Sequence, residues 1–383
     1  VVVAYTGLFL ASMPAVPLWA SPWLPPLFVA SALSCGCALL ACTCVLTGSG
    51  EELSLTAWLV NVLANGCAMV VFGCLSVRCA PLGARRGLVV ALVALTVVGT
   101  VGLAWGSALS DAWVYLSSAF SGVGTAGLLL LWAEEYRGIS PTYAKRRTIP
   151  ASMIMGVFYY LLISMLPPVA AVVATMFLPV ASVVLLRLTR RMERGDVAEE
   201  AFGRADPESD AFFCDVHGVR RGRLKNAVRY AVRFVAFTAV YCLAPGFMRG
   251  HTSALPFASA GGIGEATFAG VAIVMVAVAV ASVALLGEAK IDLAYKLVVP
   301  LMAAGLLPFL GAGQETLAAV AIMSGYILFE MYVWASLVDR ASNVSAPTAL
   351  VFGLGKSGMN VGLVAGTFVG FYFGSSSSML LVG

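Results

Sequence analysis

Long apolar runs separated by short polar breaks follow one another along almost the whole chain. An apolar helix of about 20 residues is long enough to cross a hydrocarbon core roughly 30 Å thick. Before a long polar stretch, such runs lie near residues 25–46, 55–75, 87–108, 111–132, 151–167 and 168–187. After it, they lie near residues 226–245, 263–287, 293–312, 315–338 and 347–373. The pattern predicts an all-α membrane protein with about twelve transmembrane helices.

The two ends of the chain fit this pattern less well. Residues 1–12 add a partial apolar helix, which is one more than a twelve-helix bundle needs. At the other end, an apolar run is just beginning after the serines at 375–378. We therefore expect residues 1–46 to be a foreign segment and the bundle to be truncated in its last helix.

The apolar runs fall into two sets on either side of the polar stretch, which predicts a major-facilitator-like bundle of six plus six helices. The sets echo each other, because Trp132 and Trp334 each begin a similar motif at the inner end of the fourth helix. The expected segments after residue 46 are the rest of the first half at 47–186, a polar loop at 187–225 and the second half at 226–383.

Lys and Arg occur in alternate breaks between the apolar runs. They lie at residues 85–86 and 145–147, in the stretch 187–225, and at Lys290 and Arg340. Basic residues beside membrane helices are retained on the cytoplasmic side. The loop 187–225 is therefore expected in the cytoplasm, and the chain in the inner membrane of a bacterium.

The composition excludes several functional classes. The chain is 60% hydrophobic and only 11% charged, with a mean hydropathy of +0.94, unlike a water-soluble domain. Its basic residues lie in short loops and form no stripe for direct contact with nucleic acid. The only histidines, His217 and His251, are expected on opposite sides of the membrane, which excludes a zinc or bis-histidine haem site. We expect no enzymatic activity, no catalytic residue, no metal and no cofactor.

Glu330 is an ionisable residue inside a predicted membrane helix. A charge in hydrocarbon is costly unless it is paired or faces water, so such a residue is a functional candidate. Its candidate partners are Lys356 on the following helix and Arg229 or Arg233 near the start of the seventh. Two interpretations stay open, namely an ion pair that locks two helices and a ligand-sensing or proton-linked role.

Lys356 lies in the sequence Gly355-Lys356-Ser357, which is like the end of a phosphate-binding loop. That motif requires a glycine at position 350 and a preceding strand, whereas Leu350 lies there in a predicted membrane helix. We therefore expect the Lys356 side chain to extend to the cytoplasmic face, as lysines near helix ends do.

Glycines recur at every fourth position in the run at 347–373 and just after it. They are Gly358, Gly362, Gly366, Gly370 and Gly374. They make a smooth strip along which another helix can approach closely. Packing inside the bundle is the favoured role, and a dimer interface is the alternative. Asn61 and Asn65 are candidates either for lining a ligand cavity or for hydrogen bonds between helices.

From about residue 53 onward, the chain resembles the membrane module of LuxR-type transcriptional regulators from Actinobacteria. The likeness lies in residues 122–132 with Glu134 and Tyr136, in residues 328–331 with Trp334, and in residues 351–356. In that family a major-facilitator-like bundle is thought to sense a small molecule, and a C-terminal helix-turn-helix acts on DNA. The resemblance implies DNA binding only through such a domain, which is missing from this chain.

Residues 1–46 resemble a different family, the NrfD or polysulfide-reductase type of quinol-interacting membrane subunit. The likeness lies in AYTGL at residues 4–8, AVPLW at 15–19 and LFVASALS at 27–34. This resemblance leaves open that the whole chain is a quinol-handling anchor of an oxidoreductase complex.

The main hypothesis is a membrane-embedded sensory module that binds the lipid bilayer and an unidentified small-molecule ligand. Glu330, with Lys356 or Arg233, is its expected polar element between the two halves. A quinol-interacting anchor and a major-facilitator-type transporter are the alternatives, and the oligomeric state stays open.

Overall fold

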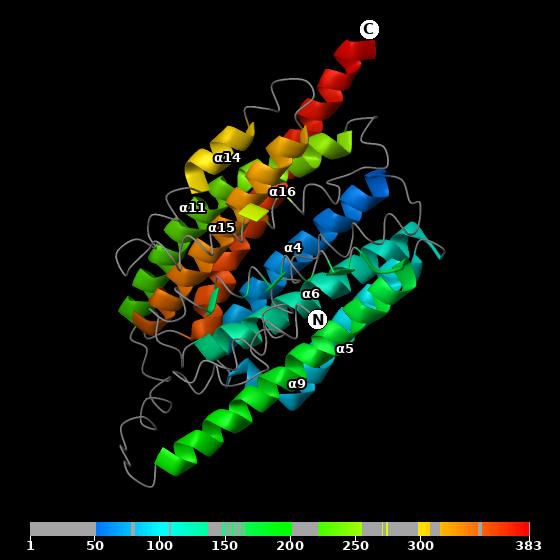
Figure 1. Cartoon of the computed structure of the whole chain (residues 1–383). Coiled ribbons are helices and arrows are strands. Elements are labelled where there is room, and N and C mark those ends of the chain that lie inside the picture. Colours follow the sequence, from blue (N-terminus) through cyan, green and yellow to red (C-terminus); the bar gives the residue numbers. More distant parts are fainter. Residues whose placement is uncertain are drawn as a thin grey trace.

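The part of the chain that the computed structural model describes is entirely helical (Figure 1). The described residues are 51–77, 81–106, 109–136, 165–200, 221–254, 298–306, 315–343 and 347–382, with single positions between 148 and 163 and between 270 and 274. The helices are α4 (Glu51–Ser76), the short 3₁₀-helix η1 (Leu82–Ala84), α5 (Arg86–Trp105), α6 (Asp111–Glu135), α9 (Pro168–Glu200), α11 (Arg221–Ala254), α14 (Val298–Leu306), α15 (Glu315–Asn343) and α16 (Thr348–Val382).

Six of the described helices contain a segment long and apolar enough to cross a membrane. The segments are Leu55–Ser76, Arg86–Trp105, Asp111–Glu135, Val169–Leu188, Leu317–Ser342 and Thr348–Phe373. They agree with six of the predicted apolar runs. The chain is therefore a multi-pass helical membrane protein.

The remaining predicted runs have different outcomes. The run at 226–245 lies in α11, which is helical but is not one of the six candidate spans. Arg233 and Arg249 lower the mean hydropathy of the described part of α11. The runs at 25–46, 151–167, 263–287 and 293–312 lie wholly or largely outside the described residues, as does the segment 1–46.

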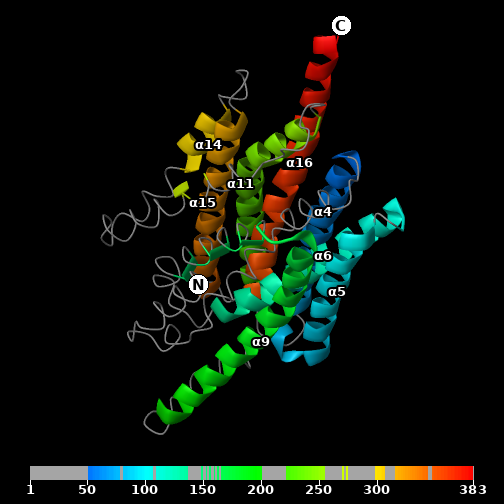
Figure 2. The ribbon, with the colours of Figure 1, turned by 45° about the vertical axis from the view of Figure 1, so that its right-hand side comes forward.

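Both ends of the polar stretch 187–225 are helical, whereas the sequence predicted a loop. α9 continues to Glu200, and α11 already begins at Arg221. Arg, Leu, Met and Glu are strong helix formers, so a helix that leaves the apolar region has no local reason to end there. Figures 1 and 2 show the last part of α9 extending beyond the other helices of its group.

The apolar run that begins after residues 375–378 is not a separate helix in the structure. α16 runs without a break from Thr348 to Val382, through all four serines. Serine is a weaker helix former than alanine, but its cost is far smaller than that of proline, so four serines do not end a helix.

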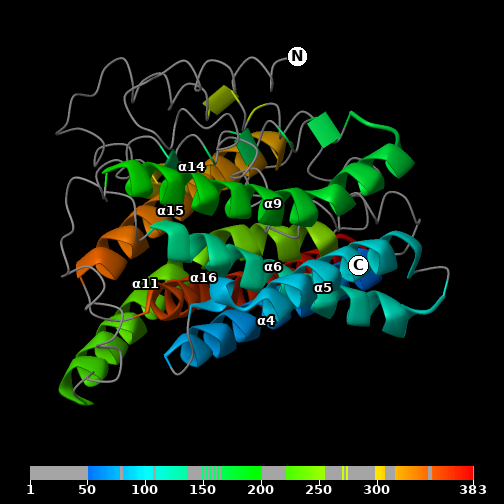
Figure 3. The same ribbon diagram turned by 90° about the horizontal axis from the view of Figure 1, so that it is seen from below.

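The described helices form two groups that correspond to the two parts of the sequence. α4, α5, α6 and α9 lie on one side, and α11, α14, α15 and α16 lie on the other (Figures 1 and 2). Seen from below, α16 lies among α11, α4 and α6 (Figure 3). The two groups therefore meet along α16.

α16 and α11 pack backbone against backbone. A Cβ atom added at Gly362 would overlap the carbonyl oxygen of Ala239 in α11, and similar overlaps with α11 occur at Gly358, Gly366 and Gly370. The structure thus places these four glycines against α11, inside the described bundle. Gly374 lies in α16, but its surroundings lie outside the described part of the structure.

α11 contributes two further glycines to this contact, which the sequence reasoning missed. A Cβ atom at Gly246 or Gly250 would overlap the carbonyl oxygen of Leu363 or Thr367 in α16. Oγ1 of Thr367 also donates a hydrogen bond to the carbonyl oxygen of Gly246 at 3.2 Å. Their four-residue spacing was a usable signal, because small residues at that spacing mark close helix contacts.

We predict that Gly362→Val destabilises the protein by about 1–3 kcal/mol, the usual effect of overpacking a tight contact. The measurement is the free energy of unfolding of the purified protein in mixed micelles. Gly87→Val on α5 is the control, because an added Cβ there has no atom within 4 Å. Equal losses in the two variants would contradict the close contact between α11 and α16.

Candidate functional site

Glu330 of α15 and Lys356 of α16 form a buried ion pair. Nζ of Lys356 lies 2.5 Å from Oε1 of Glu330, and the residues are only 7% (Glu330) and 5% (Lys356) exposed. Either charge buried alone would be strongly destabilising, whereas each here has a counter-charge. Among the partners predicted for Glu330, the structure selects Lys356.

Of the other two predicted partners, only Arg233 has a described side chain. Arg233 is exposed on α11. Arg229 lies near the start of α11, where the side chains are outside the described part. The expectation that Lys356 extends to the cytoplasmic face is wrong, because its ammonium group is buried beside a carboxylate of the neighbouring helix.

Aromatic side chains and a thiol surround the ion pair. Nζ of Lys356 lies 5.5 Å from the centroid of the Trp334 ring, which is within cation–π range. Phe329 stacks on Tyr241 of α11 with their centroids 4.8 Å apart. Cys242, the residue after Tyr241, is fully buried and close enough to interact electrostatically with both charges of the pair. The site is therefore built from three helices, namely α15, α16 and α11.

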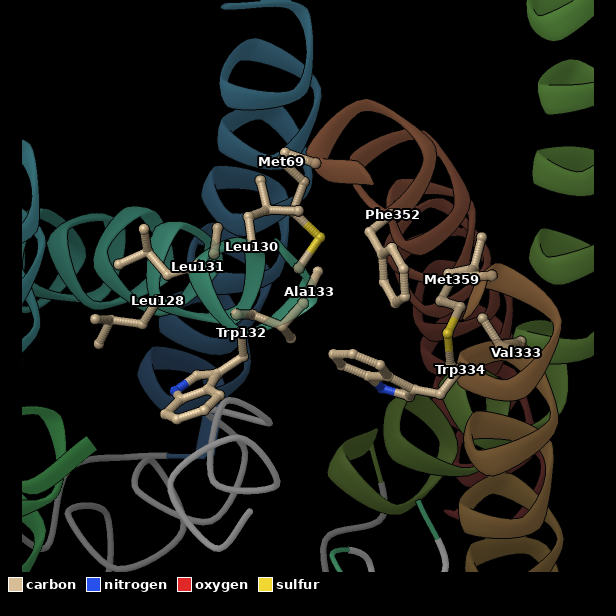
Figure 4. Close-up of a cluster of buried hydrophobic side chains, with 14 of the residues drawn as sticks. Met69, Leu128, Leu130, Leu131, Trp132, Ala133, Val333, Trp334, Phe352 and Met359 are labelled. Carbon is tan, nitrogen blue, oxygen red and sulfur yellow. The ribbon is translucent and has the colours of Figure 1, made fainter. Parts of the chain in front are cut away.

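Trp334 also connects the two helix groups. Its ring centroid lies 5.5 Å from that of Tyr136, at the end of α6, and 5.1 Å from that of Phe352 in α16. Figure 4 shows Trp334 and Phe352 on one side of this core, with Met69 of α4 and Trp132 of α6 on the other. Burial raises the pKa of the Tyr136 phenol well above its ordinary value, because the charged phenolate would lose its hydration.

Glu134 holds the loop between α4 and α5. Its two carboxylate oxygens accept hydrogen bonds from the backbone N–H groups of Leu82, at 2.8 Å, and Gly83, at 3.1 Å. These N–H groups are at the start of η1, where a helical turn supplies no acceptor and a negative charge is favourable. Sequence reasoning missed this role. The available signal was an acidic residue at the end of a membrane helix.

Asn61 and Asn65 of α4 form hydrogen bonds between helices. Their side-chain amides donate to the carbonyl oxygens of Ser118, at 3.0 Å, and Gly122, at 3.1 Å, in α6. Asn360 of α16 donates to Oδ1 of Asn65 at 3.0 Å. Of the two roles considered for these asparagines, the structure shows the interhelical one. Asn65 ties α4 to both α6 and α16.

A family model described as polysulphide reductase, NrfD, matches residues 1–174, which is less than half of the chain. The match starts in the segment that resembles NrfD and continues through α4, α5 and α6, past the boundary expected at residue 46. No curated protein matches the chain.

Two solved structures of sugar symporters are similar to the chain. The major facilitator superfamily proton:xylose symporter XylE, bound to 6-bromo-6-deoxy-D-glucose, is 14% identical, with 94% of this chain and 87% of that chain covered and a TM-score of 0.45. A variant of the E. coli fucose:proton symporter FucP is 12% identical, with 94% of this chain and 90% of that chain covered and a TM-score of 0.41. Scores of this size are too low to assign a fold or a function.

We predict that Glu330→Gln destabilises the protein by about 3–5 kcal/mol, because it leaves the Lys356 ammonium buried without its counter-charge. Lys356→Met has a similar effect, because it leaves the Glu330 carboxylate buried without its counter-charge. The double variant loses much less than the sum of the two, because neither charge remains. Denaturant unfolding of all four proteins measures this coupling, and additive losses would show that the two charges do not interact.

Proposed function

We propose that the chain is a membrane-embedded, ligand-responsive sensory module, and that a small ligand acts on it through the Glu330–Lys356 ion pair. The observation that carries the proposal is the burial of this pair beside Trp334, whose ring contacts the other helix group. A ligand shifts an equilibrium only by binding one of its two states more tightly. A polar ligand that replaces one member of the ion pair binds the state in which the pair is broken more tightly than the state in which it is intact.

In this proposal, a small molecule enters from outside and changes how the two helix groups pack. The ligand competes for Glu330 or Lys356, and α15 and α16 shift relative to α4 and α6. The two groups meet along α16, so such a shift changes the contacts of α16 with α4 and α6, including the hydrogen bond between Asn65 and Asn360.

The finer form of the proposal is a major-facilitator-like bundle of six plus six helices in a LuxR-type regulator. The resemblance at residues 122–132, 328–331 and 351–356 supports it, since these segments include Glu330 and Lys356. In such a regulator, a helix-turn-helix domain binds DNA and the membrane module controls it.

We predict that one class of small molecule raises the Tm of the full chain in nanodiscs. The probes are amino acids, organic acids and sugars at millimolar concentration. A ligand at about 100 times its Kd adds roughly 2.7 kcal/mol of stability. The increase is expected to be lost in Glu330→Gln and Lys356→Met, and kept in the destabilised control Gly362→Ala.

Two results would count against the sensory module. Absence of stabilisation by every probe class would contradict ligand binding at the ion pair. Accumulation of the stabilising compound inside proteoliposomes, abolished by Glu330→Gln, would instead identify a transporter.

A second candidate function is a quinol-interacting membrane subunit of an oxidoreductase complex. The match of residues 1–174 to the NrfD family model favours it. Co-purification with iron–sulfur and molybdenum subunits, together with saturable binding of a naphthoquinol analogue, would support this function over the sensory module.

We predict that residues 84 and 209 lie on the cytoplasmic side and residue 109 on the outer side. Ala84→Cys, Ser209→Cys and Leu109→Cys are made separately after replacing the nine native cysteines. A membrane-impermeant maleimide is then expected to label the first two only in inside-out vesicles and the third only in right-side-out vesicles. Labelling of residues 84 and 209 from opposite sides would exclude the proposed orientation.

A further inference from the structure

We infer that Trp334 and Tyr136 form a link that transmits the state of the Glu330–Lys356 ion pair to the loop between α4 and α5. The inference rests on the proposed function and deepens it by naming the output of that site. The link has four steps, which run from the ion pair to the Trp334 ring, to Tyr136, to Glu134 and to the loop.

The first step lies on one face of α15. Glu330 and Trp334 are four residues apart, so they are neighbours on the same helix face. Lys356 contacts both of them, through the carboxylate of Glu330 and the ring of Trp334. A ligand that draws the Lys356 ammonium group away from the Glu330 carboxylate therefore also moves that ammonium group relative to the Trp334 ring.

The second step crosses between the helix groups. The Trp334 ring contacts Tyr136, and both contact Phe352, whose centroid lies 6.5 Å from that of Tyr136. All three side chains are buried, with Phe352 fully so. A close-packed interior has no space into which one ring can move alone, so a displacement of Trp334 is passed to Tyr136.

The third step lies at the end of α6. Tyr136 is the residue after the last residue of α6, and its backbone N–H donates to the carbonyl oxygen of Glu134. The two residues are therefore joined by a short and directly bonded piece of backbone. A movement of the Tyr136 ring changes the position of Glu134.

The last step is the loop itself. The Glu134 carboxylate accepts hydrogen bonds from Leu82 and Gly83 and so holds η1 against α6. The residues that follow, Ala84 to Gly87, are exposed. Loosening Glu134 frees an exposed and basic segment, made of Arg85 in the loop and Arg86 at the start of α5, for contact with another part of the sensor.

A role in packing alone gives a different expectation from a role in transmission. If Trp334 only fills the core, its removal lowers stability but leaves the ion pair and the loop independent of each other. If Trp334 transmits, its removal abolishes the effect of the ion pair on the loop. A double-variant comparison separates the two roles, because only coupled positions give non-additive effects.

The test is hydrogen–deuterium exchange of the full chain in nanodiscs without ligand, followed on peptides that contain Leu82 and Gly83. We expect Glu330→Gln to speed the exchange of these amides roughly two- to thirtyfold, the range that the coupling energies of such networks give. Glu134→Ala is expected to speed it at least as much, because it removes the acceptor directly.

In the Trp334→Leu background, Glu330→Gln is expected to cause no further increase beyond that of Trp334→Leu alone. Phe329→Leu is the matched control, because Phe329 is a buried ring on the same helix that stacks on Tyr241 instead. In that background the effect of Glu330→Gln is expected to persist. Unchanged exchange in peptides of α9 shows that each variant is folded, and Trp334→Met, which also lacks a ring, replaces Trp334→Leu if the latter does not fold.

The inference is overturned if Glu330→Gln leaves the exchange of Leu82 and Gly83 unchanged, or if its effect persists without the Trp334 ring. These outcomes are separate from the ligand-binding test. If the loop is coupled to the ion pair but no ligand stabilises the protein, the sensory module is contradicted and the link is not. If a ligand stabilises the protein but the loop is not coupled, the link is contradicted and the sensory module is not.

Discussion

The close approach of α16 to α11 is the constraint on which the rest of the structure depends. Lipid tails are as apolar as leucine, so burial of apolar surface does not by itself hold two membrane helices together. The glycines of α16 let its backbone reach the backbone of α11, where many weak contacts add up. On other faces, Gly353 of α16 meets Met69 of α4, and Gly355 meets Leu337 of α15. One helix with small residues on several faces thus sets the position of its neighbours.

The ion pair uses the geometry that this packing provides. Two charges in apolar surroundings interact favourably only if they are held close together, because each loses its hydration. Gly355 and Gly358 flank Lys356 closely and keep α16 near α15 and α11. The same close packing brings Cys242 and the Trp334 ring next to the two charges. The ion pair therefore lies in a tightly packed core.

Properties that act locally along the chain were predictable from the sequence. The length of an apolar run decides whether a helix can cross lipid, and six described helices follow this rule. The pairing of Glu330 with Lys356 was among the predicted alternatives, because a charge in lipid requires a partner. The direction of the Lys356 side chain was wrongly predicted, because the prediction considered only its distance from the membrane surface. In the structure the carboxylate of Glu330 binds the ammonium group in place of water.

Contacts between distant segments were less predictable. No local pattern indicates that Asn360 lies opposite Asn65, because this depends on which helices become neighbours. Glu134 binds backbone N–H groups, which every residue except proline carries, so no partner residue type marked the contact. The continuous α16 differed from the prediction because a polar stretch ends a membrane span without ending a helix.

The hydrogen bond between Asn65 and Asn360 has a consequence for biosynthesis, because 295 positions separate the two residues. At about 5–20 residues per second, the ribosome needs roughly 15–60 s to make the intervening chain. During that time Asn65 has its bonds to Gly122 and Thr125 of α6, which emerges much earlier. The nascent α4 and α6 can therefore pair soon after insertion, while the place of α16 beside them must stay accessible until α16 leaves the translocation machinery.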